Sequence, residues 1–147
     1  MKYQELERSG RLKSYEAKPL EIERLLQVAQ RDLLAADRNL AEDADWCFTM
    51  AYNAVLQAAR ALMFSRGYRP RGTGQHWTVV RFCELTARDE YDKEVTLFDQ
   101  MRRKRNRLMY ESVGLVSQQE AEQALAFARQ FVEKLRVLIT GQLPLEL

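Results

Sequence analysis

Residues 46–67 read WCFTMAYNAVLQAARALMFSRG, and the expected fold is built around this stretch. Its apolar side chains fall on nearly every side of a helix, which is typical of an element that other helices surround. A neighbouring helix can approach closely along a stripe of small side chains: Ala51, Ala54, Ala58 and Ala61. The preceding acidic EDAD segment suits a helix N-terminus, and Gly67 suits its end. We therefore expect a buried central helix here.

Amphipathic segments flank this helix on both sides. After Pro19, which suits a first helical turn, apolar residues recur every three or four positions to Leu40. On the other side, the loop YRPRGTGQH contains the breaker residues of a long connection. A short helix around residues 77–85 and a long helix from about Asp89 are expected to follow it.

The last helix is expected to open with Ser117 and Glu120, which have the S-x-x-E spacing of a capping box, and to end near Gly141. No segment alternates between apolar and polar residues as a strand does. Four principal helices with short connections predict an all-α fold, an antiparallel up-and-down four-helix bundle with an extra short helix. The expected divisions are an N-terminal arm at 1–18, the bundle at 19–141 and a C-terminal tail at 142–147.

Composition restricts the classes of protein to consider. Of the 147 residues, 46% are hydrophobic and 30% are charged, which is typical of one globular domain. There is no run of about 20 apolar residues and no apolar secretory segment, so we expect a cytoplasmic protein without a membrane anchor. Cys47, Cys83 and the single histidine, His76, form no zinc-binding pattern. We expect no cofactor, and carboxylate-bound magnesium is the one metal site left open.

Positive charge is concentrated in MRRKRNRLMYE, residues 101–111, although the net charge is only +2. At about 100° per residue, Lys104 and Arg107 are expected to face solvent, whereas Arg105 falls near the middle of the apolar arc. One interpretation is that Arg105 extends out of the edge of the core. The other is that it pairs with a carboxylate, carbonyl, partner subunit or anionic ligand, which would offset its desolvation.

Two polar rows run along the predicted helices. The first contains Arg102, Asn106 and Tyr110, with Arg103 beside them. The second, on the otherwise apolar central helix, contains Thr49, Asn53, Gln57 and Arg60. The second row is explained either by hydrogen bonds between helices or by a cleft that both rows face. Guanidinium, amide and phenol groups in one cleft would suit phosphate and base recognition.

The stretch AYNAVLQAARALMFSRGYRPRGTGQHW, residues 51–77, together with the R-N-x-x-x-Y of Arg105, Asn106 and Tyr110, resembles a HEPN domain. The resemblance spans roughly residues 19–140. It implies an up-and-down four-helix bundle that is usually a symmetric homodimer. In active members, R-x4-6-H motifs from two subunits converge and cleave RNA without metal. Many members are toxins paired with a small nucleotidyltransferase antitoxin, and others bind nucleotide or serve as inert scaffolds.

This chain departs from the catalytic pattern at one position, because Tyr110 stands where the motif has histidine. His76 lies in the loop before the third helix and is not assumed to replace it. RNA cleavage requires removal of the 2′-hydroxyl proton, stabilisation of the phosphate and protonation of the leaving oxygen. Arg105 would stabilise the phosphate and Asn106 would orient it. A phenol is a poor base near pH 7, so Tyr110 would act as an acid, position a water or stack on a base.

Three functions remain open at this point. The first is a toxin-type HEPN ribonuclease that holds RNA at a dimer cleft. The second is a non-catalytic HEPN dimer that binds nucleotide or acts as the scaffold partner of a nucleotidyltransferase. The third is a structural dimer in which Arg105 pairs with Asp99 or Glu111. For the first two, the catalytic candidates are Arg105, Asn106 and Tyr110, and the candidates for RNA or nucleotide binding are Arg102, Arg103, Asn53, Gln57 and Arg60.

Overall fold

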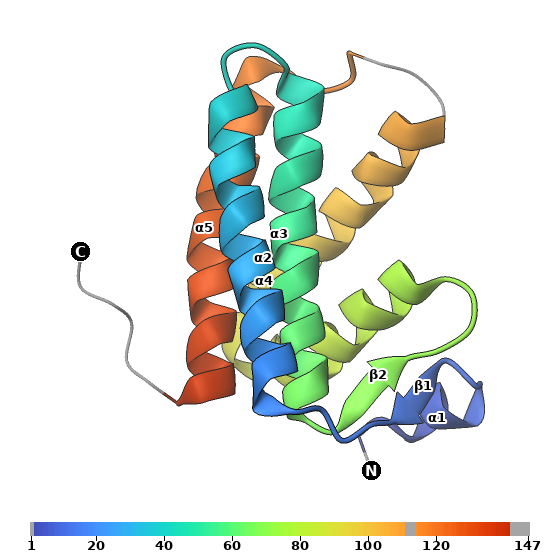
Figure 1. Ribbon diagram of the computed structural model, residues 1–147. Helices are drawn as coiled ribbons and strands as arrows, with labels where there is room; N and C mark the ends of the chain where they lie inside the picture. The colour runs from blue at the N-terminus through green and yellow to red at the C-terminus, as the bar shows by residue number, and fades with distance from the viewer. Residues whose placement is uncertain (1, 111–113, 142–147) are drawn as a thin grey trace.

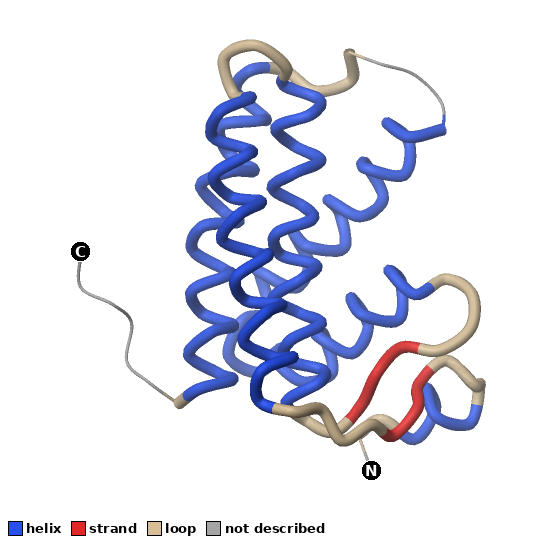
Figure 2. Tube along the Cα trace, viewed as in Figure 1, coloured by secondary structure: helices blue, strands red, loops and turns tan. Residues whose placement is uncertain are grey.

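The computed structural model describes residues 2–110 and 114–141, and most of this length is helical (Figure 1, Figure 2). In chain order the elements are α1 (Gln4–Arg8), β1 (Leu12–Ser14), α2 (Pro19–Asn39), α3 (Ala44–Ser65), β2 (Tyr68–Pro70), α4 (Gln75–Tyr110) and α5 (Gln118–Thr140). The all-α prediction is confirmed. The expected tail at 142–147 lies outside the described residues. No helix within the described ranges is both long and apolar enough to cross a membrane.

Helix α3 is the buried centre of the bundle, as predicted. It begins after Asp43, whose Oδ1 accepts a hydrogen bond from the Trp46 backbone N–H at 3.0 Å. It ends before Gly67, whose φ of 89° favours glycine. The alanines of the predicted stripe have no exposed surface. These small side chains let α2 and α5 lie close along α3 (Figure 1).

Helix α4 is bent at Tyr91, where the backbone leaves helical values with φ −132° and ψ 48°. The bend separates a first arm, residues 75–90, from a second arm, residues 92–110. Figure 1 shows both arms on the same side of α3, diverging from the bend. The short and long helices expected from the sequence are therefore both present, but they join without a loop between them.

A chain of aromatic rings holds the bend against the bundle. Tyr91 meets Phe131 of α5 edge-on at a centroid distance of 6.3 Å, and its ring lies 5.4 Å from the ammonium nitrogen of Lys134. Phe131 also contacts Phe98 at 6.3 Å, and Phe98 contacts Tyr52 of α3 at 5.9 Å. Since Phe98, Phe131 and Tyr52 are almost fully buried, these contacts fix the second arm between α3 and α5.

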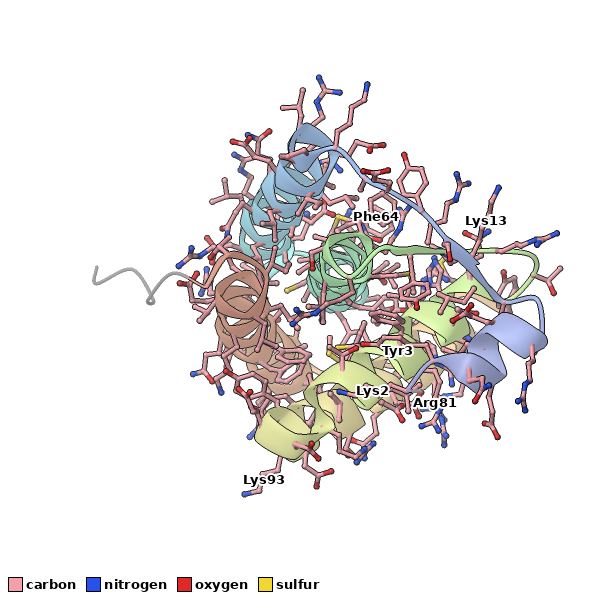
Figure 3. The ribbon with its side chains drawn as sticks, turned by 90° about the horizontal axis from the view of Figure 1, so that it is seen from below. Lys2, Tyr3, Lys13, Phe64, Arg81 and Lys93 are labelled. Atoms are coloured by element: carbon pink, nitrogen blue, oxygen red, sulfur yellow. The ribbon has the colours of Figure 1, made fainter. Side chains whose placement is uncertain are left out.

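The N-terminal segment contributes β1 to a small two-stranded sheet, an element that the all-α prediction did not include. β1 pairs with β2 in antiparallel orientation, with Leu12 opposite Pro70. Each strand has three residues, which is too short to show the alternation by which strands are recognised. Tyr3 stacks on Phe82 of α4 with ring centroids 4.2 Å apart, on the side of the molecule seen in Figure 3. This segment is therefore anchored to the first arm.

We expect Tyr91→Ala to lower the free energy of unfolding by about 1–3 kcal/mol, because it removes the ring contacts with Phe131 and Lys134. Tyr91→Phe keeps the ring and should cost less than about 1 kcal/mol. Urea denaturation followed by circular dichroism measures both variants. Equal losses would contradict the role given to the ring.

Candidate functional site

The bend in α4 brings polar residues from both arms to one face of α3. His76 is the second residue of α4, and its Nδ1 lies 3.1 Å from the hydroxyl oxygen of Tyr52. From the second arm, the positive charges of Arg105 and Arg102 act on both Tyr52 and His76. Arg60 of α3 acts on His76 as well. We call this set of five residues the basic cluster.

The position of His76 corrects the expectation that it lies in a loop. Helix α4 already begins at Gln75, because the carbonyl oxygen of Gly74 accepts hydrogen bonds from the Thr78 backbone N–H at 3.1 Å and from its hydroxyl at 3.3 Å. Gly74 has a φ of 66° and ends the loop just before the helix. The His76 ring is therefore held by a helical turn. Its place beside the arginines depends on the bend at Tyr91, for which the sequence carries no local signal.

The protonation states of the two neighbouring rings follow from their surroundings. Burial lowers the pKa of His76, and the three guanidinium groups of the basic cluster lower it further. The imidazole is therefore neutral at pH 7. Burial raises the pKa of the Tyr52 phenol, so this group keeps its proton. The His76 Nε2 has no hydrogen-bond partner among the described residues.

A cavity of about 150 Å³ opens beside the imidazole. Its polar lining consists of Asn53, Gln57, Arg60, Gln75 and His76. Amide, guanidinium and imidazole groups in one small space provide hydrogen-bond donors and acceptors for a polar ligand.

Two arginines of the basic cluster have no carboxylate partner among the residues that the structure describes. Arg105 is half-buried and makes no hydrogen bond or ion pair there. Arg60, also half-buried, donates only to the amide oxygen of Gln57, at 3.3 Å. Arg102 differs, because it pairs with Asp99 at 3.0 Å. A half-buried guanidinium without a counter-charge is a favourable contact for an anion.

The alternative pairing of Arg105 with Asp99 is not found. Asp99 Oδ1 accepts from Arg102, and its Oδ2 lies 3.0 Å from the guanidinium of Arg103. Both oxygens of this carboxylate are thus engaged with other residues of the basic run. Arg103 is well exposed, so it presents its guanidinium to solvent as well as to Asp99. The other proposed partner, Glu111, lies outside the described residues.

Other residues of the basic run face elsewhere. Lys104 was expected in solvent, but it forms an ion pair with Glu120, because the second arm passes the first turn of α5. Arg107 is exposed, as expected. Asn106 is half-buried, and Tyr110, the last residue of α4, has 84% of its surface exposed. No hydrogen bond among the described residues joins either to the basic cluster, and their catalytic roles stay predictions.

The polar row on α3 serves two different purposes. Asn53 donates a 2.6 Å hydrogen bond to Oδ2 of Asp32, a buried carboxylate that also pairs with Arg31 at 3.1 Å. This part of the row is a hydrogen-bond network between α2 and α3. Asn53 also lines the cavity beside the imidazole, together with Gln57 and Arg60 further along the helix. Arg60 is the one member of this row that belongs to the basic cluster, and the binding roles assigned to the row stay predictions.

The potential ligands for a metal ion are scattered. Within residues 2–110 and 114–141, no group of three or more histidine, cysteine, aspartate or glutamate side chains is placed to hold a metal. Cys47 and Cys83 are buried free thiols. Burial raises the pKa of both, to about 12 for Cys83, so neither is a thiolate at neutral pH.

His76 is the only histidine of the chain, so its titration can be followed by NMR as a single imidazole signal. We expect its pKa to lie below the ordinary value of about 6.5. Arg105→Met should raise this pKa, because it removes a positive charge that disfavours the imidazolium. Arg107→Met removes an exposed charge from the same run and should leave it unchanged. An identical pKa in wild type and Arg105→Met would show that Arg105 does not face the imidazole.

Comparison with known proteins identifies the family. A family model described as HEPN domain matches residues 22–138, most of the chain. A search of the curated proteins found no match, and a search of the solved structures found none either. HEPN domains are generally linked to RNA binding and ribonuclease activity, and they commonly form dimers. The matched range includes α3 and α4, which carry the basic cluster. The chain therefore belongs to the HEPN domain family.

Proposed function

We propose that this HEPN protein is a toxin-related protein that binds RNA through backbone phosphate at the basic cluster. The observation that carries the proposal is the half-buried state of Arg60 and Arg105, neither of which meets a carboxylate among the described residues. Phosphate oxygens accept hydrogen bonds from a guanidinium in a bidentate arrangement and supply the missing negative charge. The general link of HEPN domains to RNA supports this ligand.

The size of the cavity favours RNA backbone over a free nucleotide. Its volume is about 150 Å³, whereas pockets that enclose a whole small molecule are about 300–1,000 Å³. One phosphate or the edge of one base fits such a space, and the rest of the ligand must lie outside it. Arg102 and the exposed Arg103 place further positive charge on the second arm, where the rest of an RNA strand could contact it.

We expect Arg105→Met to weaken RNA binding about tenfold or more, since it removes a desolvated phosphate contact. Arg107→Met removes the same charge from an exposed position and should weaken binding less than about threefold. Fluorescence anisotropy with a labelled structured RNA, at two salt concentrations, measures both. Equal losses would assign binding to the general charge of the run rather than to the basic cluster.

We also propose that the RNA-binding form is a homodimer that uses the second arm of α4. A groove of about 370 Å³ lies between this arm and α5, with Leu97, Met101 and Phe127 in its lining. Leu97 and Met109 are exposed on the same arm, by 44% and 51%. An apolar groove beside exposed apolar side chains is typical of a surface that another chain covers. A partner in this groove would contact the second arm, the segment that also carries Arg102 and Arg105.

Leu97→Glu should convert the homodimer to monomers, because it places a charge in the apolar contact. Leu34→Glu is the matched control, since Leu34 is also exposed, by 59%, but lies on α2. Sedimentation velocity at micromolar concentration distinguishes the two species. A dimer that survives Leu97→Glu and dissociates with Leu34→Glu would place the interface on α2 instead.

A second candidate function is a non-catalytic partner of a nucleotidyltransferase, and the exposure of Tyr110 favours it. At 84% exposure, this side chain is available as a contact or as a target of modification. The two functions differ in what the purified protein does alone. Stable co-purification with a minimal nucleotidyltransferase, together with no RNA binding by the free HEPN protein, would favour the partner function over RNA binding.

A further inference from the structure

We propose that His76 is the catalytic proton acceptor of an RNA transesterification at the basic cluster, with Nε2 as the accepting atom. This inference rests on the RNA binding proposed above and adds a reaction and a residue to it. It assigns to His76 the role that a histidine of the R-x4-6-H motif would have, although His76 lies on the other arm of α4.

The position of the imidazole supports this role. Nδ1 lies 3.1 Å from the Tyr52 hydroxyl oxygen, and His76 lines the same cavity as Arg60. When Nδ1–H donates to the Tyr52 oxygen, Nε2 carries the lone pair and is left free for substrate. Tyr52 is thus a positioning residue, which fixes the ring; its hydroxyl can donate or accept, and our proposal takes the tautomer in which Nδ1 carries the proton.

The charged groups around His76 suit a base at neutral pH. Tyr52 and Arg60 face it from α3, and Arg102 and Arg105 face it from the second arm. No carboxylate of the described residues pairs with it. The three positive charges and burial lower the pKa of the imidazole, so it is unprotonated and able to accept a proton at pH 7. The same guanidinium groups stabilise the negative charge that develops on the phosphate.

The reaction balances without a metal or an oxidant. The 2′-hydroxyl of one ribose attacks the adjacent phosphorus while its proton moves to Nε2 of His76. A bond forms between phosphorus and the 2′-oxygen, and the bond between phosphorus and the 5′-oxygen of the next nucleotide breaks. The leaving 5′-oxygen takes a proton from water, and the imidazolium returns its proton to the hydroxide so formed. The products are a 2′,3′-cyclic phosphate and a 5′-hydroxyl.

Tyr110 fits the role of proton acceptor less well. Its side chain is 84% exposed at the end of α4, and no described residue holds it in place by a hydrogen bond. A protonated phenol is also a weaker base than a neutral imidazole. In our proposal, Arg105 of the family motif therefore lies at the basic cluster, but the proton acceptor is His76 and not Tyr110, the residue at the motif's histidine position.

The test is cleavage of a mixed structured RNA by the full-length protein in excess chelator. Wild type is compared with His76→Gln, Tyr110→Phe and the exposed control Arg107→Met. RNA binding and circular dichroism are measured on the same samples. We expect His76→Gln to lower the cleavage rate at least about 100-fold while it retains binding and fold, and we expect cyclic-phosphate ends on the wild-type products.

A wild-type pH–rate profile provides a second measurement that does not depend on any variant folding. Its acidic limb should coincide with the pKa of His76 measured by NMR, because only the neutral imidazole accepts the proton. Cleavage that survives His76→Gln but is lost in Tyr110→Phe would overturn the assignment, as would an acidic limb that differs from the NMR value. RNA binding without cleavage would overturn the catalytic inference and leave the proposed function standing, whereas absence of RNA binding would remove both.

Discussion

The bend of α4 at Tyr91 is the constraint on which the site depends. In a straight helix His76 and Arg105 would lie about 44 Å apart, at 1.5 Å per residue. Because the backbone leaves helical values at Tyr91, the second arm returns along α3, and both residues act on Tyr52. The rings that hold this bend belong to the core, since Tyr91 packs on Phe131. The core of the bundle and the geometry of the basic cluster are therefore set by the same contacts.

Comparison with the buried carboxylate of Asp32 shows that the basic cluster is unusual within its own fold. Asp32 is 3% exposed, and it is satisfied by the Asn53 amide and the Arg31 guanidinium. Arg60 and Arg105 receive no such compensation from the described residues, although carboxylates such as Asp99 occur on the same helices. Positive charges gathered without counter-charges lower stability. Sites of this kind persist when a ligand supplies the opposite charge, which is why we assign an anion to the cluster.

Local sequence determined most of the fold and part of the site. The periodicity of α2, the alanine stripe of α3 and the capping box before α5 are short-range features, and the structure contains each of them. The apolar periodicity of the second arm likewise identified Arg105 as a charged residue within an apolar arc. Contacts between distant elements were not predictable in this way: the ion pair of Lys104 with Glu120 and the approach of His76 to Tyr52 both depend on where the second arm lies. The bend at Tyr91 contains neither proline nor glycine, so nothing local marked it.

Tyr110 need not be the proton acceptor of the site, because the other arm of α4 also carries a candidate for this role. Tyr110 lies five residues after Arg105, about 7.5 Å further along the helix axis, at an exposed end. From the opposite arm, His76 lies close enough to the same arginine for the guanidinium charge to lower the pKa of its imidazole. A proton acceptor has only to lie within hydrogen-bond reach of the attacking hydroxyl, and the element that carries it is not constrained. In our proposal, the bent helix therefore keeps the arginine of the family motif as the anion site and recruits the imidazole from its first turn.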